Sequence, residues 1–528
     1  IITFSLSALF FGIPLFFTGS TFQGLAFEKQ IFFFFWVLVA LVSWVAKGAI
    51  AGEMRIRRTP MDIPLLILLI VYLVAALLSV DRWHSFWGAF GDPSRGFLGI
   101  VGLAVAYMLV VSHFSRERFK WFFGSLITSG SLVVMWVFLA VMGIHFVPSS
   151  WESRVPLAPL GTLGGTALFL GLMLPVLVVA LTRVWKTRVS AWLSWLVSAV
   201  LLIVIALDTF ALLALYQYTP WWPIMIGFGV FLVYILAQIV SIPEKWAWLP
   251  MLILVLLLAF FMGGDKNTLA RASLPAEAVP NMSLSWEVAK KAIGERFFFG
   301  SGPATYSYAF SMYRPQEYNN QPFFSVRFLQ GSGFGFEALP TLGVVGACAL
   351  AVFVLSFLSI GLYTLSRDRE RNKLLSVGLW SACVIFILGA GVIPVNAGLL
   401  LSGVLIASLA MAVILWEGSG EGKYFTLSLT SSPQFALVLA FVSLVVTAGV
   451  AFVFSFVGRA FIADALVAQA LHQPLSEDSA AKTFRASQSM TQEGQYDIIL
   501  SQIFLNLAAS EAAKPERDRN AEKVGKYL

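Results

Sequence analysis

Charged residues are scarce in this chain. Only 12% of its 528 residues are Asp, Glu, Lys or Arg, whereas 59% are hydrophobic, including 47 Phe and 17 Trp. A soluble domain carries roughly 25% charged residues, so this composition excludes an ordinary soluble protein. Apolar runs of about 20 residues recur instead, each long enough to cross a hydrocarbon layer of about 30 Å. The segments of about 10 residues with alternating polarity that a membrane β-barrel needs do not occur. We therefore predict an all-α polytopic membrane protein.

Cysteine and histidine are also scarce. The two cysteines, Cys348 and Cys383, both fall inside apolar runs and indicate neither a disulfide nor a metal site. The four histidines form no cluster with each other or with cysteine. The sequence has no GxxxxGK[ST] phosphate loop and no GxSxG nucleophile elbow in a strand–helix setting. We therefore expect no metal and no bound cofactor, and no ATP hydrolysis.

The apolar runs predict 12 to 13 transmembrane helices. The thirteen candidate spans lie at about 1–19, 30–52, 63–80, 96–113, 121–143, 162–182, 190–214, 222–241, 247–264, 338–364, 375–393, 397–416 and 435–456.

Basic residues between the spans predict the orientation of the chain. Fifteen of them lie in alternate connections, namely Arg55, Arg57, Arg58, Arg116, Arg118, Lys120, Arg183, Lys186, Arg188, Lys245, Arg367, Arg369, Arg371, Lys373 and Lys423. The opposite short connections hold only Lys29, Arg82, Arg95 and Arg154. By the positive-inside rule, the first set faces the cytoplasm. The basic residues that give the net charge of +7 therefore indicate the orientation of the chain in the membrane, and do not indicate nucleic-acid binding.

Two parts of the chain outside the spans are long, and the parity of spans places both on the non-cytoplasmic side. Residues 265–337 form one large external loop within a transmembrane domain of residues 1–456. Its LSWEVAKKAI segment has helical periodicity, and we expect two short helices joined by a turn at Gly300–Pro303. Residues 457–528 form a soluble, Ala-rich tail with polar breaks at HQPLSED and MTQEGQ, similar to a partial tetratricopeptide unit. One such unit buries its own face poorly, so we expect this tail either to continue past Leu528 or to dock on the membrane domain. A simple helical extension remains the alternative.

Arginines beside span ends are the main chemical groups available on this outer side. Arg154, Arg314 and Arg327 lie close to turns, aromatics or glycines, and paired guanidinium bonds suit a diphosphate. We predict that these three arginines converge on one cavity, with anchoring at lipid headgroups as the alternative for each. Tyr313, Asn320 and Ser332 are further candidates for binding substrate. Asp208 is the single acid deep in its apolar run, and is either functional or a boundary residue.

Four stretches resemble the O-antigen ligase and polymerase superfamily of bacterial membrane glycosyltransferases. They are SVDRWHSFWGAFGDPSRGFLGIVGL, RVPLAPLGTLGGTALFLGLMLP, WEVAKKAIGERFFFGSGPATYSYAF and FEALPTLGVVG, and the likeness covers about residues 1–456. The resemblance implies a GT-C type enzyme in the bacterial cytoplasmic membrane. Such an enzyme transfers a glycan from a polyprenyl diphosphate to a glycan, lipid or protein acceptor on the outer side. It also implies arginines that hold the diphosphate.

The chain departs from this family at one position. The family's candidate base is a histidine in a His-Asn pair, which would fall at Ser332 and Gly333. Glu337 is the only carboxylate in that motif, so we expect it to take the role of base. With Arg314 and Arg327, it completes the predicted catalytic set.

Three functions stay open at this point. The first is the transfer or polymerisation of a lipid-linked glycan. The second is a lipid-linked glycan flippase or transporter, although such a protein needs charged groups along several spans. The third is an inactive membrane scaffold whose tail binds a protein partner, which the missing histidine favours.

Overall fold

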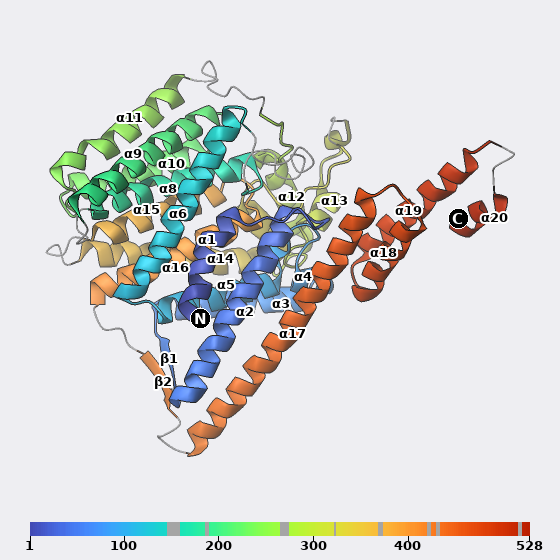
Figure 1. Ribbon diagram of the computed structural model, residues 1–528, viewed down its shortest axis with the longest axis horizontal. Helices are drawn as coiled ribbons and strands as arrows, with labels where there is room; N and C mark the ends of the chain where they lie inside the picture. Colours follow the sequence, from blue (N-terminus) through green and yellow to red (C-terminus); the bar gives the residue numbers. More distant parts are fainter. Residues whose placement is uncertain are drawn as a thin grey trace.

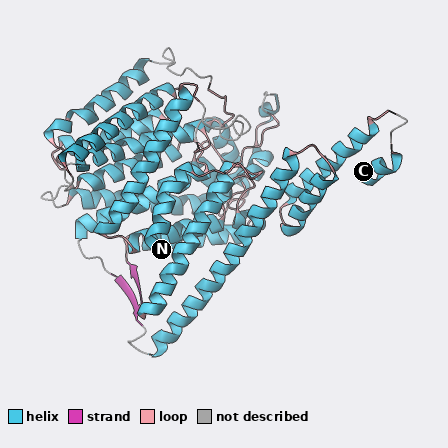
Figure 2. Cartoon of the chain, viewed as in Figure 1, coloured by secondary structure: helices cyan, strands magenta, loops and turns pink. Residues whose placement is uncertain are grey.

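The computed structural model describes residues 1–144, 159–184, 190–263, 274–320, 324–367, 373–419, 424–428, 433–515 and 520–528. The regular secondary structure of the described part is helical apart from one small sheet (Figure 2). Its apolar helices are α1 (Ile2–Leu15), α2 (Leu25–Ala51), α3 (Asp62–Leu77), α5 (Phe97–Ser112), α6 (Arg116–Val141), α8 (Leu163–Val184), α9 (Ala191–Ala214), α10 (Trp221–Leu236), α11 (Trp248–Gly263), α14 (Phe334–Ser366), α15 (Leu374–Ala390), α16 (Ala397–Ser419) and α17 (Pro433–His472).

Each predicted span coincides with one of these helices. Eight of the apolar segments are long enough to cross a membrane. The remaining five, α1, α3, α5, α10 and α15, have 14 to 17 residues. An α-helix rises about 1.5 Å per residue, so helices of the first group cover the hydrocarbon layer of about 30 Å. The fold is that of an all-α, multi-pass membrane protein.

The helices form one bundle with a buried centre and an exposed margin. Helix α8 packs on α9 and α15, and α16 packs on α5 and α15. In the most apolar 18-residue stretch of each segment, 89% of the residues are buried in Leu163–Val184 and 83% in Ala397–Gly418. Only 17% of them are buried in Ser443–His472. Helices α8 and α16 are therefore central. Helix α17 lies alongside α2 at the margin and extends beyond the bundle (Figure 1).

A two-stranded antiparallel sheet joins connections that are distant in sequence. Strand β1 (Glu53–Arg57) pairs with β2 (Tyr424–Ser428), with Glu53 opposite Ser428. This sheet was not predicted. It lies at the end of the bundle opposite to the short helices α12 and α13 (Figure 1). We call these two ends the β end and the site end.

Short helices gather at the site end. They are α4 (Arg82–Trp87), α12 (Met282–Glu295), α13 (Tyr306–Tyr313) and the 3-10 turns η1 (Pro93–Arg95) and η4 (Gln316–Asn320); a further 3-10 turn, η2 (Glu244–Trp246), precedes α11. The two helices expected within the 265–337 loop are thus present, on either side of the Gly300–Pro303 turn. Their apolar faces form a small core of their own around Val288, Tyr306, Phe310 and Tyr318.

The Gly300–Pro303 turn fills a break in α14. The helix contains Pro340 and has non-helical backbone at Gly343, where φ is 66°. Such a break frees backbone groups that must find other partners. The N–H of Ser301 donates to the carbonyl of Pro340 (2.9 Å), and the N–H of Gly302 donates to the carbonyl of Thr341 (2.8 Å). The turn therefore replaces the helical hydrogen bonds that α14 lacks.

The C-terminal tail continues directly from α17. This helix of 40 residues runs without interruption through residues 456 and 457, the expected boundary of the tail. Helices α18 (Glu477–Ser489), α19 (Gly494–Ala512) and α20 (Ala521–Tyr527) follow. The polar breaks predicted from the sequence are the two turns that flank α18. Helix α18 packs against both α17 and α19, as in a helical repeat.

Candidate functional site

A buried ion pair lies at the site end of the bundle. Arg95 closes η1 and Glu337 lies in the first turn of α14, and their side chains are only 5% and 7% exposed. Arg95 Nη1 donates to Glu337 Oε2, and Nη2 donates to the backbone carbonyl of Val395. The guanidinium carbon also lies 4.8 Å from the centre of the Phe334 ring. We call these four residues, with Asp92, the Arg95 site.

Asp92 fixes the loop that carries Arg95. One of its carboxylate oxygens accepts from the N–H (3.1 Å) and the hydroxyl (2.6 Å) of Ser94. The other accepts from Gln330 Nε2 (2.7 Å) and from the N–H of Ala397 (3.1 Å). Asp92 is 5% exposed, and three of these four bonds are buried. One carboxylate thus connects the Arg95 loop, the segment before α14 and the first turn of α16.

A large apolar cavity adjoins the Arg95 site. It has a volume of about 410 Å³ and lies between α3, α5, α14, α15 and α16. Its lining includes Phe334 and Val395, both of which contact Arg95. From there it extends along α14 to Phe357 and along α3 to Met61. A volume of a few hundred Å³ is typical of pockets that hold a small molecule or part of a longer one.

Ser332 and Glu337, both predicted from the sequence, lie in the segment that leads into α14. Ser332 is 4% exposed, and its hydroxyl donates to the carbonyl of Val392 (3.2 Å). Its N–H donates to Ser285 Oγ in α12 (2.9 Å). Ser332 therefore serves to attach this segment to α12 and to the turn before α16.

Tyr313 belongs to the small core of α12 and α13, and Arg314 follows it at the end of α13. The hydroxyl of Tyr313 donates to Glu295 Oε2 (2.6 Å). Arg314 Nη1 donates to the carbonyl of Phe324 (2.8 Å), and its guanidinium lies 5.5 Å from the centre of the Tyr318 ring. Both side chains thus have partners within the loop, separate from Glu337.

Of the remaining predicted residues, two lie at the surface, one lies outside the described residues and one is buried. Asn320 and Arg327 are exposed. Arg154 lies outside the described residues, so the predicted convergence of three arginines stays a prediction. Asp208 in α9 is fully buried, and within the described part neither of its carboxylate oxygens has a hydrogen-bond partner.

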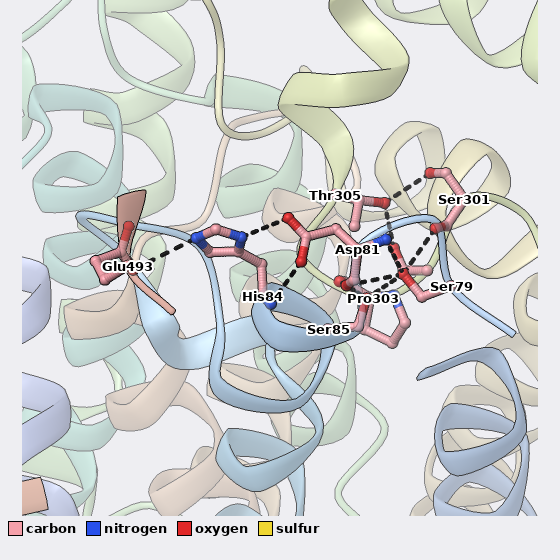
Figure 3. Close-up of polar contacts among 9 residues, drawn as sticks. Ser79, Asp81, His84, Ser85, Ser301, Pro303, Thr305 and Glu493 are labelled. Carbon is pink, nitrogen blue, oxygen red and sulfur yellow. Dashed lines mark hydrogen bonds and ion pairs between the residues drawn. The ribbon is translucent and has the colours of Figure 1, made fainter. Parts of the chain in front are cut away.

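His84 forms a second charged cluster at the site end (Figure 3). Its Nδ1 lies 2.6 Å from Asp81 Oδ2, and its Nε2 lies 3.4 Å from Glu493 Oε2 in the tail. Burial alone lowers the pKa of His84, but the hydrogen bonds to these two carboxylates outweigh it and raise the pKa to about 9. The hydrogen bond from His84 likewise lowers the pKa of Asp81. His84 is therefore an imidazolium at neutral pH and cannot act as a general base.

Beside His84, a chain of hydroxyls holds the Gly300–Pro303 turn (Figure 3). Ser85 Oγ lies 2.8 Å from the carbonyl oxygen of Pro303 and 2.6 Å from Ser79 Oγ, and its one proton can be donated to either of them. Ser79 Oγ donates to the carbonyl of Ser301 (3.0 Å). The loop after α3 therefore supports the same turn that fills the break in α14.

Arg95 and Asp92 are the residues that sequence reasoning missed. Arg95 was counted only as a topological charge, because it lies in a short connection. Two features of the sequence could have singled it out. It is one of only four cations in the short connections expected on the outer side, and it stands in the glycine-rich stretch GAFGDPSRGFLG. Glycines permit this close packing, since a Cβ on Gly96 would lie 2.5 Å from the backbone of Trp87.

Among the described residues, no group of three or more His, Cys, Asp or Glu side chains could hold a metal ion. The chemistry available at the Arg95 site is therefore that of a guanidinium, two carboxylates and backbone groups. Beside it lies an apolar cavity that can take hydrocarbon.

The fold and its apolar helices define a multi-pass helical membrane protein. Comparison with protein-family models gives no match, and comparison with curated proteins gives none either. The argument for function therefore depends on the site itself.

Proposed function

We propose that the protein transfers or polymerises a glycan from a polyprenyl-diphosphate donor to an acceptor at the outer face of the bacterial cytoplasmic membrane. The observation that carries this proposal is the position of the buried Arg95–Glu337 pair beside an apolar cavity. A polyprenyl diphosphate combines the two matching chemistries. Its isoprenoid carbons suit the cavity, and its diphosphate suits a guanidinium.

Arg95 has two roles in the proposed reaction. Without donor, it neutralises Glu337. With donor, the diphosphate takes the place of the carboxylate on the guanidinium, because paired Arg–phosphate bonds are strong and geometrically specific. This exchange frees the carboxylate of Glu337 next to the diphosphate.

Bond formation then follows at the sugar. The acceptor hydroxyl oxygen forms a bond to the anomeric carbon while the bond from that carbon to the diphosphate oxygen breaks. The electron pair leaves with the diphosphate, whose charge Arg95 stabilises. The hydroxyl proton passes to Glu337, as general-base help typically contributes about 10²–10⁴-fold to the rate.

The direct test is transfer in vitro. Purified protein in nanodiscs is mixed with a polyprenyl-diphosphate oligosaccharide and candidate glycan or lipid acceptors. Arg95→Ala should abolish transfer, and Arg327→Ala tests whether the surface arginine predicted from the sequence contributes. Arg485→Ala, which changes an exposed arginine in the tail, is the matched control.

A second variant tests the cavity without touching the ion pair. Ala351 lines the cavity from α14, and Ala351→Trp should reduce its volume. Under the proposal, this variant loses affinity for the long-chain donor but keeps its affinity for a short-chain polyprenyl diphosphate. Equal affinity of Ala351→Trp and the native protein for the long-chain donor would contradict the cavity assignment.

A lipid-linked glycan flippase is the second candidate, and the length of the cavity favours it. The lining reaches from the Arg95 site to Met61, next to the β end of the bundle. Donor that crosses proteoliposome membranes without any glycosylated product would support the flippase and overturn the transferase.

A further inference from the structure

The C-terminal tail is clamped to the loops of the site end through one glutamine. The two carboxylate oxygens of Asp464, on α17, accept from the N–H (2.9 Å) and from Nε2 (3.1 Å) of Gln23. Tyr496, at the start of α19, donates its hydroxyl to Asp464 (3.0 Å). Asp464 is fully buried and Tyr496 is 1% exposed. This arrangement is thus an internal joint between the tail and the segment that precedes α2.

The same glutamine holds the loop that carries Arg95. Gln23 Oε1 accepts from the N–H of Gly91 (2.8 Å), whose φ of +91° is a conformation that favours glycine. The neighbouring Phe90 ring lies edge-on to Tyr496, with 5.8 Å between the ring centres. The amide of Gln23 therefore bonds to the tail through Nε2 and to the Arg95 loop through Oε1.

The chain leads from this joint directly into the Arg95 site. Gly91 is followed by Asp92, which bonds to the segment before α14 and to α16. Three residues further on, Arg95 forms the buried pair with Glu337. His84 and Glu493 provide a second contact between the tail and the same stretch of chain.

We propose that Gln23 and Asp464 are positioning residues of the Arg95 site, so that docking of the tail fixes the place of the Arg95 guanidinium. Gln23 supplies the link, and Asp464 fixes the amide of Gln23 in the orientation that presents Oε1 to Gly91. The tail thus acts on the membrane site from a distance. The part of this inference that concerns donor binding rests on the proposed function, whereas the part that concerns loop order does not.

Hydrogen exchange tests the ordering of the loop. Gln23→Ala removes the side-chain link and keeps the backbone bond from residue 23 to Asp464. We expect amide exchange in residues 88–96 to become about two- to tenfold faster, the effect of losing one such hydrogen bond. Exchange in α18, to which Gln23 forms no bond among the described residues, should stay unchanged. Tyr527→Phe, which removes a hydrogen bond to Glu477 within the tail, is the matched control and should leave 88–96 unchanged. Unaltered exchange in 88–96 of Gln23→Ala would overturn the proposal.

A double-mutant cycle on donor binding separates positioning from general stability. The probe is farnesyl diphosphate, measured against Gln23→Ala, Arg95→Lys and the double variant. If Gln23 acts through Arg95, the loss from Gln23→Ala should disappear in the Arg95→Lys background. Equal losses in both backgrounds would mean that Gln23 is only structural, and would overturn the positioning role. If the native protein does not bind farnesyl diphosphate while 88–96 still responds to Gln23→Ala, the proposed function fails and the tail-to-loop coupling stands.

Discussion

Replacing Arg95 by Met should destabilise the protein more than any single change at its surface. Methionine keeps much of the side-chain length but leaves the carboxylate of Glu337 without its cation, and the carbonyl of Val395 without its donor. Both partners of the pair are less than a tenth exposed, so water compensates little. Breaking a buried ion pair from one side costs about 3–5 kcal/mol. At roughly 2 °C per kcal/mol for a long chain, we expect the Tm to fall by about 6–10 °C.

Replacing both partners should recover most of the stability that Arg95→Met loses. Apolar side chains of similar volume in place of a buried ion pair are often neutral or stabilising. The double variant Arg95→Met/Glu337→Leu should therefore melt close to the native protein, although it should not transfer glycan. Thermal unfolding in one detergent compares the native protein, Arg95→Met, Glu337→Leu and the double variant, with Arg485→Ala as control. A fall below about 2 °C for Arg95→Met, or additive losses in the double variant, would show that the pair is solvated and that the reasoning is wrong.

Three other changes have defined expectations. Gly302→Ala places a Cβ 2.0 Å from Ser79 Oγ at a φ of +115°, so the Tm should fall by several degrees, whereas Gly294→Ala, with open space around it, should not lower the Tm. The folded pKa of His84, about 9, lies above the ordinary 6.5, so its contribution to tail docking is full below about pH 6.5 and is lost as the pH rises through 9. Proteolysis of the tail should therefore be faster at pH 9.5 than at pH 6.5, and His84→Gln should remove this difference. Ser332→Ala removes one hydrogen bond and should leave the rate of transfer within about threefold of native, so a loss of hundredfold would place its hydroxyl in the reaction.

The helices of the bundle could be predicted because they depend on local composition. A run of about 20 apolar residues specifies a helix in a membrane whatever its neighbours are, since only a helix satisfies its own backbone. The pairing of β1 with β2 could not be predicted, because it depends on contacts between distant segments and not on local composition. Residues 53–57 and 424–428 lie in different connections, and only the packing of the helices between them brings the two strands together.

The break in α14 was indicated by the sequence, but its partner was not. Pro340 and Gly343 in FEALPTLGVVG indicate an irregular helix, and GSGP indicates a turn. Neither stretch reveals that the two fit each other. The fit depends on glycines, because a Cβ on Gly300 would lie 2.6 Å from the carbonyl oxygen of Pro340, and one on Gly343 would lie 2.4 Å from that of Phe298.

The Arg95 site was only half predictable. Glu337 stood out in the sequence because it is the one carboxylate in its motif. Its partner was overlooked because a basic residue between two spans is normally read as a sign of topology. The difference lies in burial, and the burial of Arg95 requires Glu337, on α14, and Val395, just before α16, to lie against its guanidinium. The short connections expected on the outer side hold only four cations, so each of them deserved to be weighed as a possible ligand for an anion.

Glu337 lies on the short side of the break in α14. Residues 334–342 form the part of α14 that precedes the break at Gly343, and Glu337 lies within it. This short part does not continue the helical bonds of the long part, and its end carbonyls bind the turn at Ser301 and Gly302. The carboxylate is therefore oriented by the Gly300–Pro303 turn and by Arg95, and less by the membrane-embedded remainder of α14. The Gly300–Pro303 turn therefore supports the short helix that presents Glu337.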